Sequence, residues 1–190
     1  MAVQLVQKGQ ADFTQPIELM MDCHRRIEHF LGVLEAVGER LGRTELTTEG
    51  RRALETALEY FRTAAPRHSA DEEESLFPRL RSLARDDVRP LLDGAARLER
   101  EHRAAEEVHE RVDRLGCRWL QDGRLHSDDL SAFLGDLRSL RALYAEHIAF
   151  EDEQLFPAAA RLLNQSAIAV IGREMAARRG LGDGGARMHP

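Results

Sequence analysis

The sequence predicts an all-α protein: an antiparallel up-down four-helix bundle, followed by a short fifth helix and a loose C-terminal tail. Apolar residues recur at alternating steps of three and four, the period of helices that pack in a bundle. Good helix formers (Leu, Ala, Arg and Glu) dominate the 190 residues, and aromatic residues make up only 5%. Four long amphipathic stretches joined by short loops favour neighbours that run antiparallel.

The first two long helices have recognisable start and stop signals. Helix one should begin near Pro16, an apt first-turn residue, with Thr14 close to its cap, and Gly42 should end it. Helix two should begin at Thr47 or Thr48. Pro66 lies inside its apolar stripe and should bend or break it, because proline removes a helical hydrogen bond.

The remaining helices are predicted in the same way. Helix three should begin near Pro90 and close at Gly123, and helix four should follow with Asp128 as a plausible cap. A shorter helix should cover residues 166–178. We therefore divide the chain into an N-terminal extension (1–13), the bundle (14–163), the short C-terminal helix (164–179) and a flexible, glycine-rich tail (180–190).

Charge and cysteine content exclude several classes of protein. A net charge of −6 argues against a dedicated nucleic-acid binder. No apolar run approaches the roughly 18 residues of a membrane span, and the N-terminus lacks a secretory-signal pattern. Cys23 and Cys117 cannot make a disulfide framework, so we expect a reduced, cytoplasmic protein. The sequence does not fix the oligomeric state; a monomer is slightly favoured.

Polar residues occupy inward-facing positions in all four long helices. Each stripe carries an imidazole where an apolar residue is expected, and two of these histidines are followed one turn later by a glutamate on the same face. The set is His24, His68, Glu72, His102, His147 and Glu151. Buried unpaired carboxylates are costly, so two of them among four imidazoles need a shared compensating charge, which metal ions would supply.

An internal repeat supports a metal site. The segment 68–78 (HSADEEESLFP) reappears 79 residues later at 147–157 (HIAFEDEQLFP), with seven of eleven positions identical. Helices one and three match more faintly at an offset of 78, around His24 and His102. Two helical hairpins related by a pseudo-two-fold axis would thus each offer one His and one His-x-x-x-Glu, which describes a dinuclear site. The bland alternative is a bundle with satisfied core histidines and i,i+4 ion pairs.

The chain resembles the hemerythrin-like (HHE cation-binding) family over roughly residues 14–160. The resemblance rests on His24, on segments 68–78 and 147–157, and on Glu101-His102. It implies a non-haem di-iron centre, joined by an oxo or hydroxo bridge, inside a four-helix bundle. The four histidines would be terminal ligands, and Glu72 and Glu151 would bridge the metals. Mixed imidazole and carboxylate ligands also suit iron or manganese; zinc is a further substitute. Ferritin-like bundles are a weaker analogy, because they use Glu-x-x-His.

One departure shapes the functional hypothesis. The oxygen-carrying members have another His one turn after the third-helix His, where this chain has Glu106. Glu106 and Glu28 are thus candidate extra ligands, or acceptors that orient an imidazole. The pattern H…HxxxE…H…HxxxE resembles a bacterial subgroup, which disfavours oxygen transport. Tyr144, one turn before His147, could contact the centre, although a core Tyr with a satisfied hydroxyl is the more ordinary interpretation.

Three functions remain open. The leading hypothesis is redox handling of hydrogen peroxide or nitric oxide, as a peroxidase, a catalase-like enzyme or a nitric-oxide-consuming oxidoreductase. The second is reversible binding or sensing of oxygen or nitric oxide, and the third is iron storage or transfer.

Other residues carry weaker expectations. Cys23 and His109 should pack, with a proton relay or second site as the minor option for His109. The acidic residues flanking Glu72 and Glu151 should be solvated, and the basic segment 172–179 should lie over the bundle or touch a partner. The last three histidines should lie on the surface, in a loop and in the tail: His29, His126 and His189.

Overall fold

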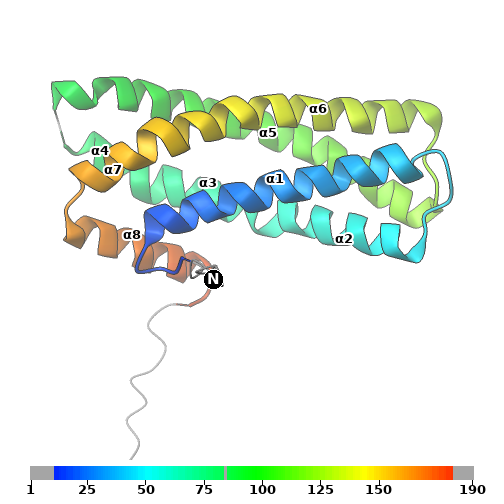
Figure 1. Cartoon of the computed structure of the whole chain (residues 1–190), viewed down its shortest axis with the longest axis horizontal. Helices are drawn as coiled ribbons and strands as arrows, with labels where there is room; N and C mark the ends of the chain where they lie inside the picture. The colour runs from blue at the N-terminus through cyan, green and yellow to red at the C-terminus, as the bar shows by residue number, and fades with distance from the viewer. Residues whose placement is uncertain (1–10, 84, 182–190) are drawn as a thin grey trace, which may run out of the picture.

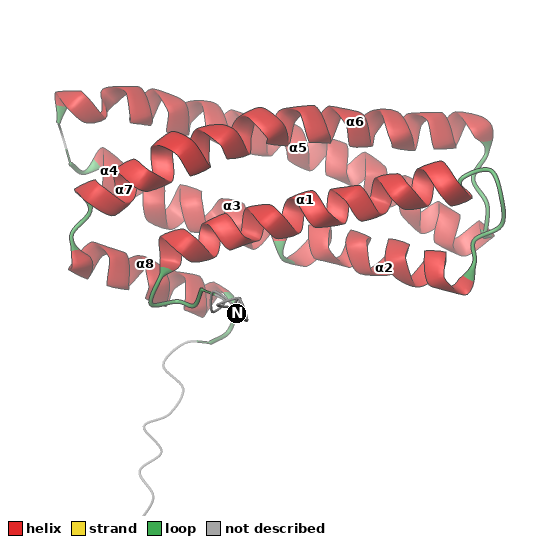
Figure 2. Cartoon of the chain, in the orientation of Figure 1, coloured by secondary structure: helices red, strands yellow, loops and turns green. Residues whose placement is uncertain are grey.

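The computed structural model describes residues 11–83 and 85–181, and these residues form helices, turns and loops without a strand (Figures 1 and 2). The long helices are α1 (Pro16–Leu41), α2 (Thr48–Thr63), α5 (Arg89–Asp122) and α6 (Ser127–Phe150). The shorter elements are α3 (Ala65–Ala70), η1 (Asp71–Leu76), α4 (Phe77–Arg81), η2 (Asp86–Val88), η3 (Glu151–Leu155), α7 (Phe156–Leu162) and α8 (Gln165–Arg178). The predicted all-α class is confirmed.

Four helical columns make up the bundle. Helix α1 packs against α2 and α6, and α5 packs against the same two, so the columns occupy the corners of a square. The second column continues from α2 through α3, η1 and α4, and the fourth from α6 through η3 and α7 (Figure 1). Successive columns run in opposite directions, as the short loops predicted. Helix α8 lies at the end of the bundle, beside the start of α1 (Figure 1).

Thr14 lies next to the cap of α1, as predicted, whereas the predicted cap of α6 is wrong. Gln15 is the N-cap of α1 and makes no side-chain cap bond. Thr14 instead turns toward Asp12, whose carboxylate accepts from the Thr14 amide and hydroxyl. At α6 the N-cap is His126, and Asp128 lies in the first helical turn. A carboxylate there still stabilises the helix, because it interacts favourably with the positive end of the helix dipole.

Other predicted boundaries are confirmed. The Thr47 hydroxyl accepts from the amide of Gly50 at 3.1 Å and caps α2. Gly123, with a φ of 73°, ends α5 in the left-handed conformation that glycine adopts without strain. The second column breaks after Thr63, and Pro66 stands in the first turn of α3.

Both repeat segments contain a π-helical turn that the sequence analysis missed. The turns η1 and η3 begin at or just before Glu72 and Glu151, and each ends shortly before a proline, Pro78 or Pro157. Proline cannot donate to the carbonyl four residues earlier, and its ring crowds that carbonyl. A wider turn relieves this conflict, and such turns occur frequently at functional sites.

Two apolar clusters fill the bundle and leave a polar layer between them. One contains Trp119 and Phe133 and includes α1 from Ile27 onward. The other contains Phe77 and Phe156 and includes α1 up to Met20. His24 lies between these two stretches of α1 and is fully buried. Polar side chains at this level are therefore shielded from water on both sides.

The C-terminal helix completes the second apolar cluster. Asn164 caps α8 by accepting from the amide of Ala167 at 2.8 Å. Ile171 and Met175 are fully buried against the bundle. Of the predicted tail, residues 182–190 lie outside the described residues, as does most of the predicted N-terminal extension. Among the helices of the described chain, none combines the length and apolarity needed to cross a membrane.

Candidate metal centre

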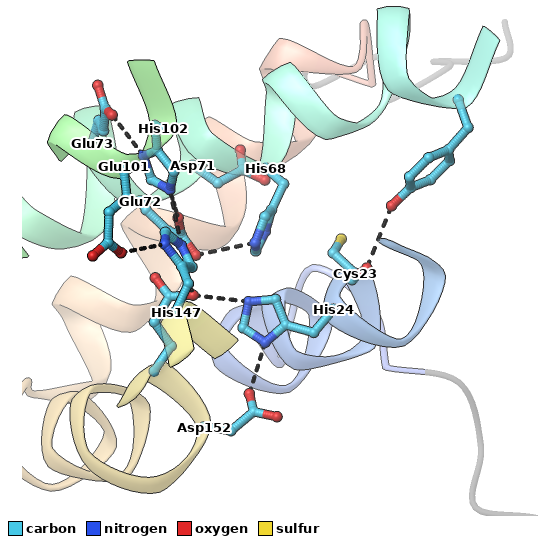
Figure 3. A network of polar contacts seen from close by, with 12 residues as sticks. Cys23, His24, His68, Asp71, Glu72, Glu73, Glu101, His102, His147 and Asp152 are labelled. Carbon is cyan, nitrogen blue, oxygen red and sulfur yellow. Dashed lines mark hydrogen bonds and ion pairs between the residues drawn. The ribbon is translucent and has the colours of Figure 1, made fainter. Parts of the chain in front are cut away.

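Six side chains predicted as metal ligands converge in the polar layer (Figure 3). They form two groups, each with one potential ligand atom per residue and all these atoms within 4.8 Å of one another. The groups are His24, His68, Glu72 and Glu151, and Glu72, His102, His147 and Glu151. Both glutamates belong to both groups, so the site consists of two half-sites that share their carboxylates.

Each shared carboxylate contacts two imidazoles through their Nε2 atoms. Glu151 Oε2 lies 3.1 Å from His24 and 3.2 Å from His147. Glu72 lies 3.2 Å from His68, through Oε1, and 3.3 Å from His102, through Oε2. The glutamates lie at the two π-helical turns, and both belong to both groups, so the two turns meet at the cluster. The four Nε2 atoms thus point inward from four different columns.

These close contacts do not amount to satisfied hydrogen bonds. His24 Nε2 and all four carboxylate oxygens of Glu72 and Glu151 are buried and have no hydrogen-bond partner within the described chain. Buried polar atoms without partners cost free energy comparable to a lost hydrogen bond or more. Inward-facing nitrogen and carboxylate lone pairs are what one or two divalent cations would satisfy, so the donor set fits a metal site.

Three of the four imidazoles also contact a carboxylate through Nδ1, on the side of the ring that faces away from the cluster. Each Nδ1 contacts an acidic side chain from another column: His24 with Asp152 at 2.8 Å, His102 with Glu73 at 2.7 Å and His147 with Glu101 at 3.0 Å. An Nδ1–H that donates to a carboxylate leaves the Nε2 lone pair free for a metal and fixes the ring orientation. Figure 3 draws these contacts on the outer side of the cluster.

The prediction that the acidic residues after Glu72 and Glu151 in each run are solvated is therefore wrong for Glu73 and Asp152. Glu73 and Asp152 each follow an inward glutamate by one residue, and they hold imidazoles of neighbouring columns. Asp71 is fully buried and binds Arg178 and Arg179 of the C-terminal segment. The sequence pattern could not show these contacts, because the partner of each carboxylate comes from another helix, far away in the sequence.

Glu28 and Glu106 belong to neither group. Both are exposed, and Glu28 faces Arg25 of its own helix at 3.7 Å. The imidazole-orienting role considered for them is filled by Glu101, Glu73 and Asp152. Glu101 directly precedes His102, but it reaches across to His147 on α6.

The pKa values of the two shared carboxyl groups shift in opposite directions. Burial, reinforced by the neighbouring Glu151, raises the pKa of Glu72 well above its usual range. Burial also opposes ionisation of Glu151, but the imidazoles of His147 and His24 lower its pKa. Burial lowers the pKa of His24, but the carboxylates of Asp152 and Glu151, which face its two ring nitrogens, outweigh burial and raise the value to about 9. Without a metal, protons balance the charge of the cluster.

A cavity of about 260 Å³ reaches this cluster from the side. All four histidines line it, together with apolar groups such as Phe61, Pro66 and Ile148. On its wall, His109 Nε2 and the Tyr144 hydroxyl are hydrogen-bonded at 3.0 Å. Burial lowers the pKa of His109 to about 4, so this imidazole is neutral at pH 7. The satisfied hydroxyl of Tyr144 is the arrangement that the more ordinary interpretation anticipated.

The remaining histidines and cysteines lie outside both groups. His29 and His126 are exposed, and His189 is outside the described residues. Cys23 is buried in the bundle and Cys117 is exposed; both are free thiols. Phe156 stacks on His24 with ring centroids 5.4 Å apart and closes one side of the cluster. This stacking shields the His24 ring from water.

The fold and the site define a class of protein: a four-helix bundle whose interior holds a cluster of four histidines and two glutamates that could bind metal ions. The hemerythrin HHE cation-binding domain matches residues 15–159, and the chain belongs to this family. An uncharacterized protein of Haemophilus influenzae is 30% identical over 169 residues, which cover 89% of this chain and 92% of that relative. The resemblance inferred from the histidine pattern is confirmed.

Proposed function

We propose that this chain is a cytoplasmic non-haem di-iron protein whose centre reacts with small oxidants, namely hydrogen peroxide or nitric oxide. The observation that carries the proposal is that two half-sites share both Glu72 and Glu151. Carboxylates common to two half-sites suit a pair of ions better than a single ion, because each glutamate has two oxygens to offer. Two free cysteines fit a reducing compartment.

The donor set favours iron over the common alternatives. Each half-site has two imidazoles of its own and the two shared carboxylates, and no cysteine belongs to either group. Zinc sites are usually four-coordinate and often use thiolates, whereas imidazole with carboxylate suits iron or manganese. Bound iron would supply redox chemistry and Lewis acidity for the oxidant. Zinc and manganese remain metals that metal analysis has to distinguish from iron.

The chain's own residues orient the ligands, exclude water and admit a small molecule. Glu73, Glu101 and Asp152 hold imidazole Nδ1–H groups and leave Nε2 directed at the centre. Phe156 and the apolar clusters keep the surroundings dry. The cavity is large enough for peroxide or nitric oxide. In the tautomer in which His109 Nε2–H donates to the Tyr144 oxygen, the Tyr144 hydroxyl keeps its own proton to donate to a small polar ligand.

The test compares the iron-loaded protein with a variant that lacks one inward imidazole. Hydrogen peroxide consumption and nitric oxide decay should be measured for the wild type, His147→Ala and Glu28→Ala. We expect His147→Ala to lose the activity and Glu28→Ala to retain it, because Glu28 is exposed and outside the cluster. Equal background rates in all three proteins would reject the proposal.

Metal analysis accompanies the kinetics and separates the other two functions. The proposal requires two irons per chain. More than two would indicate iron storage or transfer. An oxygen or nitric oxide complex that is stable and reverses under argon, without net consumption of the oxidant, would indicate reversible binding or sensing.

A further inference from the structure

The two halves of the cluster are related by the internal repeat, so their outer contacts can be compared position by position. His24 and His102 correspond at an offset of 78, and Asp152 and Glu73 correspond at an offset of 79. The structure obeys this symmetry at the first pair of outer contacts: Asp152 holds His24 Nδ1, and Glu73 holds His102 Nδ1. The same symmetry predicts a second pair, at His68 and His147.

Only one contact of the second pair is present in the described residues. Glu101 holds Nδ1 of His147 at 3.0 Å. Nδ1 of His68, on the symmetric ring, is buried and has no hydrogen-bond partner among the described residues. The whole His68 residue is only 3% exposed, so bulk water does not replace the missing partner. Its Nε2 meets Glu72 like the other three rings meet their glutamates.

The sequence explains the difference. The position that corresponds to Glu101, one residue before the helix-one histidine, holds Cys23. A thiol is a weak hydrogen-bonding group and, unlike a carboxylate, cannot strengthen an imidazole by accepting its N–H with a full negative charge. One half-site thus has two imidazoles backed by carboxylates, His102 and His147, whereas the other has one, His24.

We propose that the two half-sites hold metal unequally, with the His102–His147 half-site binding its ion more tightly and filling first. A carboxylate behind a histidine ligand fixes its tautomer and raises its basicity, and removing such a partner typically lowers metal affinity by about 10- to 100-fold. Glu101 is therefore a positioning residue for one of the two ions. The proposal rests on the metal centre proposed above and adds an order of filling to it.

Two steps in a titration would not suffice as a test, because two cations that share Glu72 and Glu151 repel each other even in a symmetric site. The test is instead which variant lowers the affinity for the first metal ion that binds. Glu101→Gln and Asp152→Asn are matched, since each removes one outer charge from a different half-site. Each carboxylate also faces one arginine, Arg97 or Arg25, so the electrostatic background is similar.

The experiment titrates the full-length apoprotein with cobalt(II) under anaerobic conditions and follows visible absorption and heat. We expect Glu101→Gln to lower the affinity for the first cobalt ion by about 10-fold or more, to the affinity of the other half-site. We expect Asp152→Asn to leave the first step unchanged and to weaken the second. Glu106→Gln, an exposed charge on the same helix as Glu101, should change neither step.

Other outcomes overturn the proposal. If both variants lower the affinity for the first cobalt ion by the same small factor, the half-sites are equivalent. The first ion then binds in whichever half-site the substitution has left unchanged. If Glu106→Gln acts like Glu101→Gln, the effect is one of net charge. If the wild type binds no cobalt, the proposed metal centre itself fails, and the order of filling fails with it; the first two outcomes leave the centre standing.

Discussion

The Asp71 carboxylate is fully buried and lies 2.7 Å, through Oδ2, from Nη2 of Arg179. Its other oxygen, Oδ1, accepts from Arg178 at 2.8 Å. Asp71 opens the π-helical turn that carries Glu72, whereas the two arginines end the C-terminal helix. The basic segment that could have bound a partner is thus used within the chain, and α8 is tied to the helix that carries half of the proposed centre.

This tie predicts a large effect of Asp71→Asn. The substitution leaves two partly buried guanidinium groups without their anion, and breaking such a buried pair costs about 3 kcal/mol or more. Urea unfolding should show this loss, and limited proteolysis should cut first near α8. The control is Asp87→Asn, whose partner Arg85 is exposed, and its stability should equal that of the wild type. Equal stability of the two variants would contradict the role of the tie.

Glu72→Gln should separate metal binding from folding. Burial raises the pKa of Glu72, which favours its neutral carboxyl form in the apoprotein, and the neutral amide of glutamine replaces that form with little change. We expect the apoprotein's free energy of unfolding to change by less than about 1 kcal/mol. Bound metal, measured by elemental analysis, should fall sharply, because a shared carboxylate is lost.

Exposed Glu106→Gln is the matched control for Glu72→Gln and should keep its metal. A Glu72→Gln variant that holds two metals per chain would show that this carboxylate is no ligand.

The buried imidazole of His109 should make the folded protein less stable in acid. Burial lowers its pKa from 6.5 to about 4, so between these values the unfolded chain binds a proton that the folded chain excludes. Stability is therefore full above pH 6.5 and is lost as the pH falls toward 4. Between pH 7 and pH 5 the loss from this group is about 2 kcal/mol.

The measurement for His109 is urea unfolding of the apoprotein at pH 5, 6 and 7, for the wild type and His109→Gln. Groups that titrate in both proteins cancel in the difference. The wild type should lose about 2 kcal/mol more than the variant over this range. Parallel pH profiles would mean that His109 is protonated as readily in the fold as in the unfolded chain.

Two glycines within helices, the buried Gly172 and the partly exposed Gly135, should respond oppositely to alanine. A Cβ at Gly172 of α8 would overlap the carbonyl oxygen of Phe13, a backbone atom that yields only if the whole segment shifts. Gly172→Ala should therefore lower stability by about 1–3 kcal/mol. At Gly135 of α6 a Cβ meets only an Arg138 side-chain atom at 4.0 Å. Gly135→Ala should raise stability by about 0.5–1 kcal/mol, because alanine restricts the unfolded chain. Thermal unfolding distinguishes the two signs.

Features that depend on one helix at a time could be predicted from the sequence. The period of three and four placed each imidazole on an inward face, and the i,i+4 spacing put Glu72 beside His68 and Glu151 beside His147. Those distances are properties of a single column. The predicted Asp128 cap was wrong because several residues near a helix start compete for the same amides, and the local pattern does not decide between them.

The π-helical turns could have been anticipated only in part. Pro78 and Pro157 signalled a conflict in each column, but a proline can be accommodated by a kink, a break or a wider turn. Pro66 produced a break, whereas Pro78 and Pro157 followed wider turns. The packing of neighbouring columns selects among these outcomes.

Helical periodicity was enough to predict the bundle and the inward set of four histidines and two glutamates, because it fixes which face of a helix a residue occupies. The carboxylates that contact the outer nitrogens of the imidazoles depend on the fold, since Asp152 reaches His24 across 128 residues and Glu101 reaches His147 across 46. The fold also leaves His68 without such a partner among the described residues. Contacts between columns depend on their relative rotation and rise, which the pattern within one column does not contain.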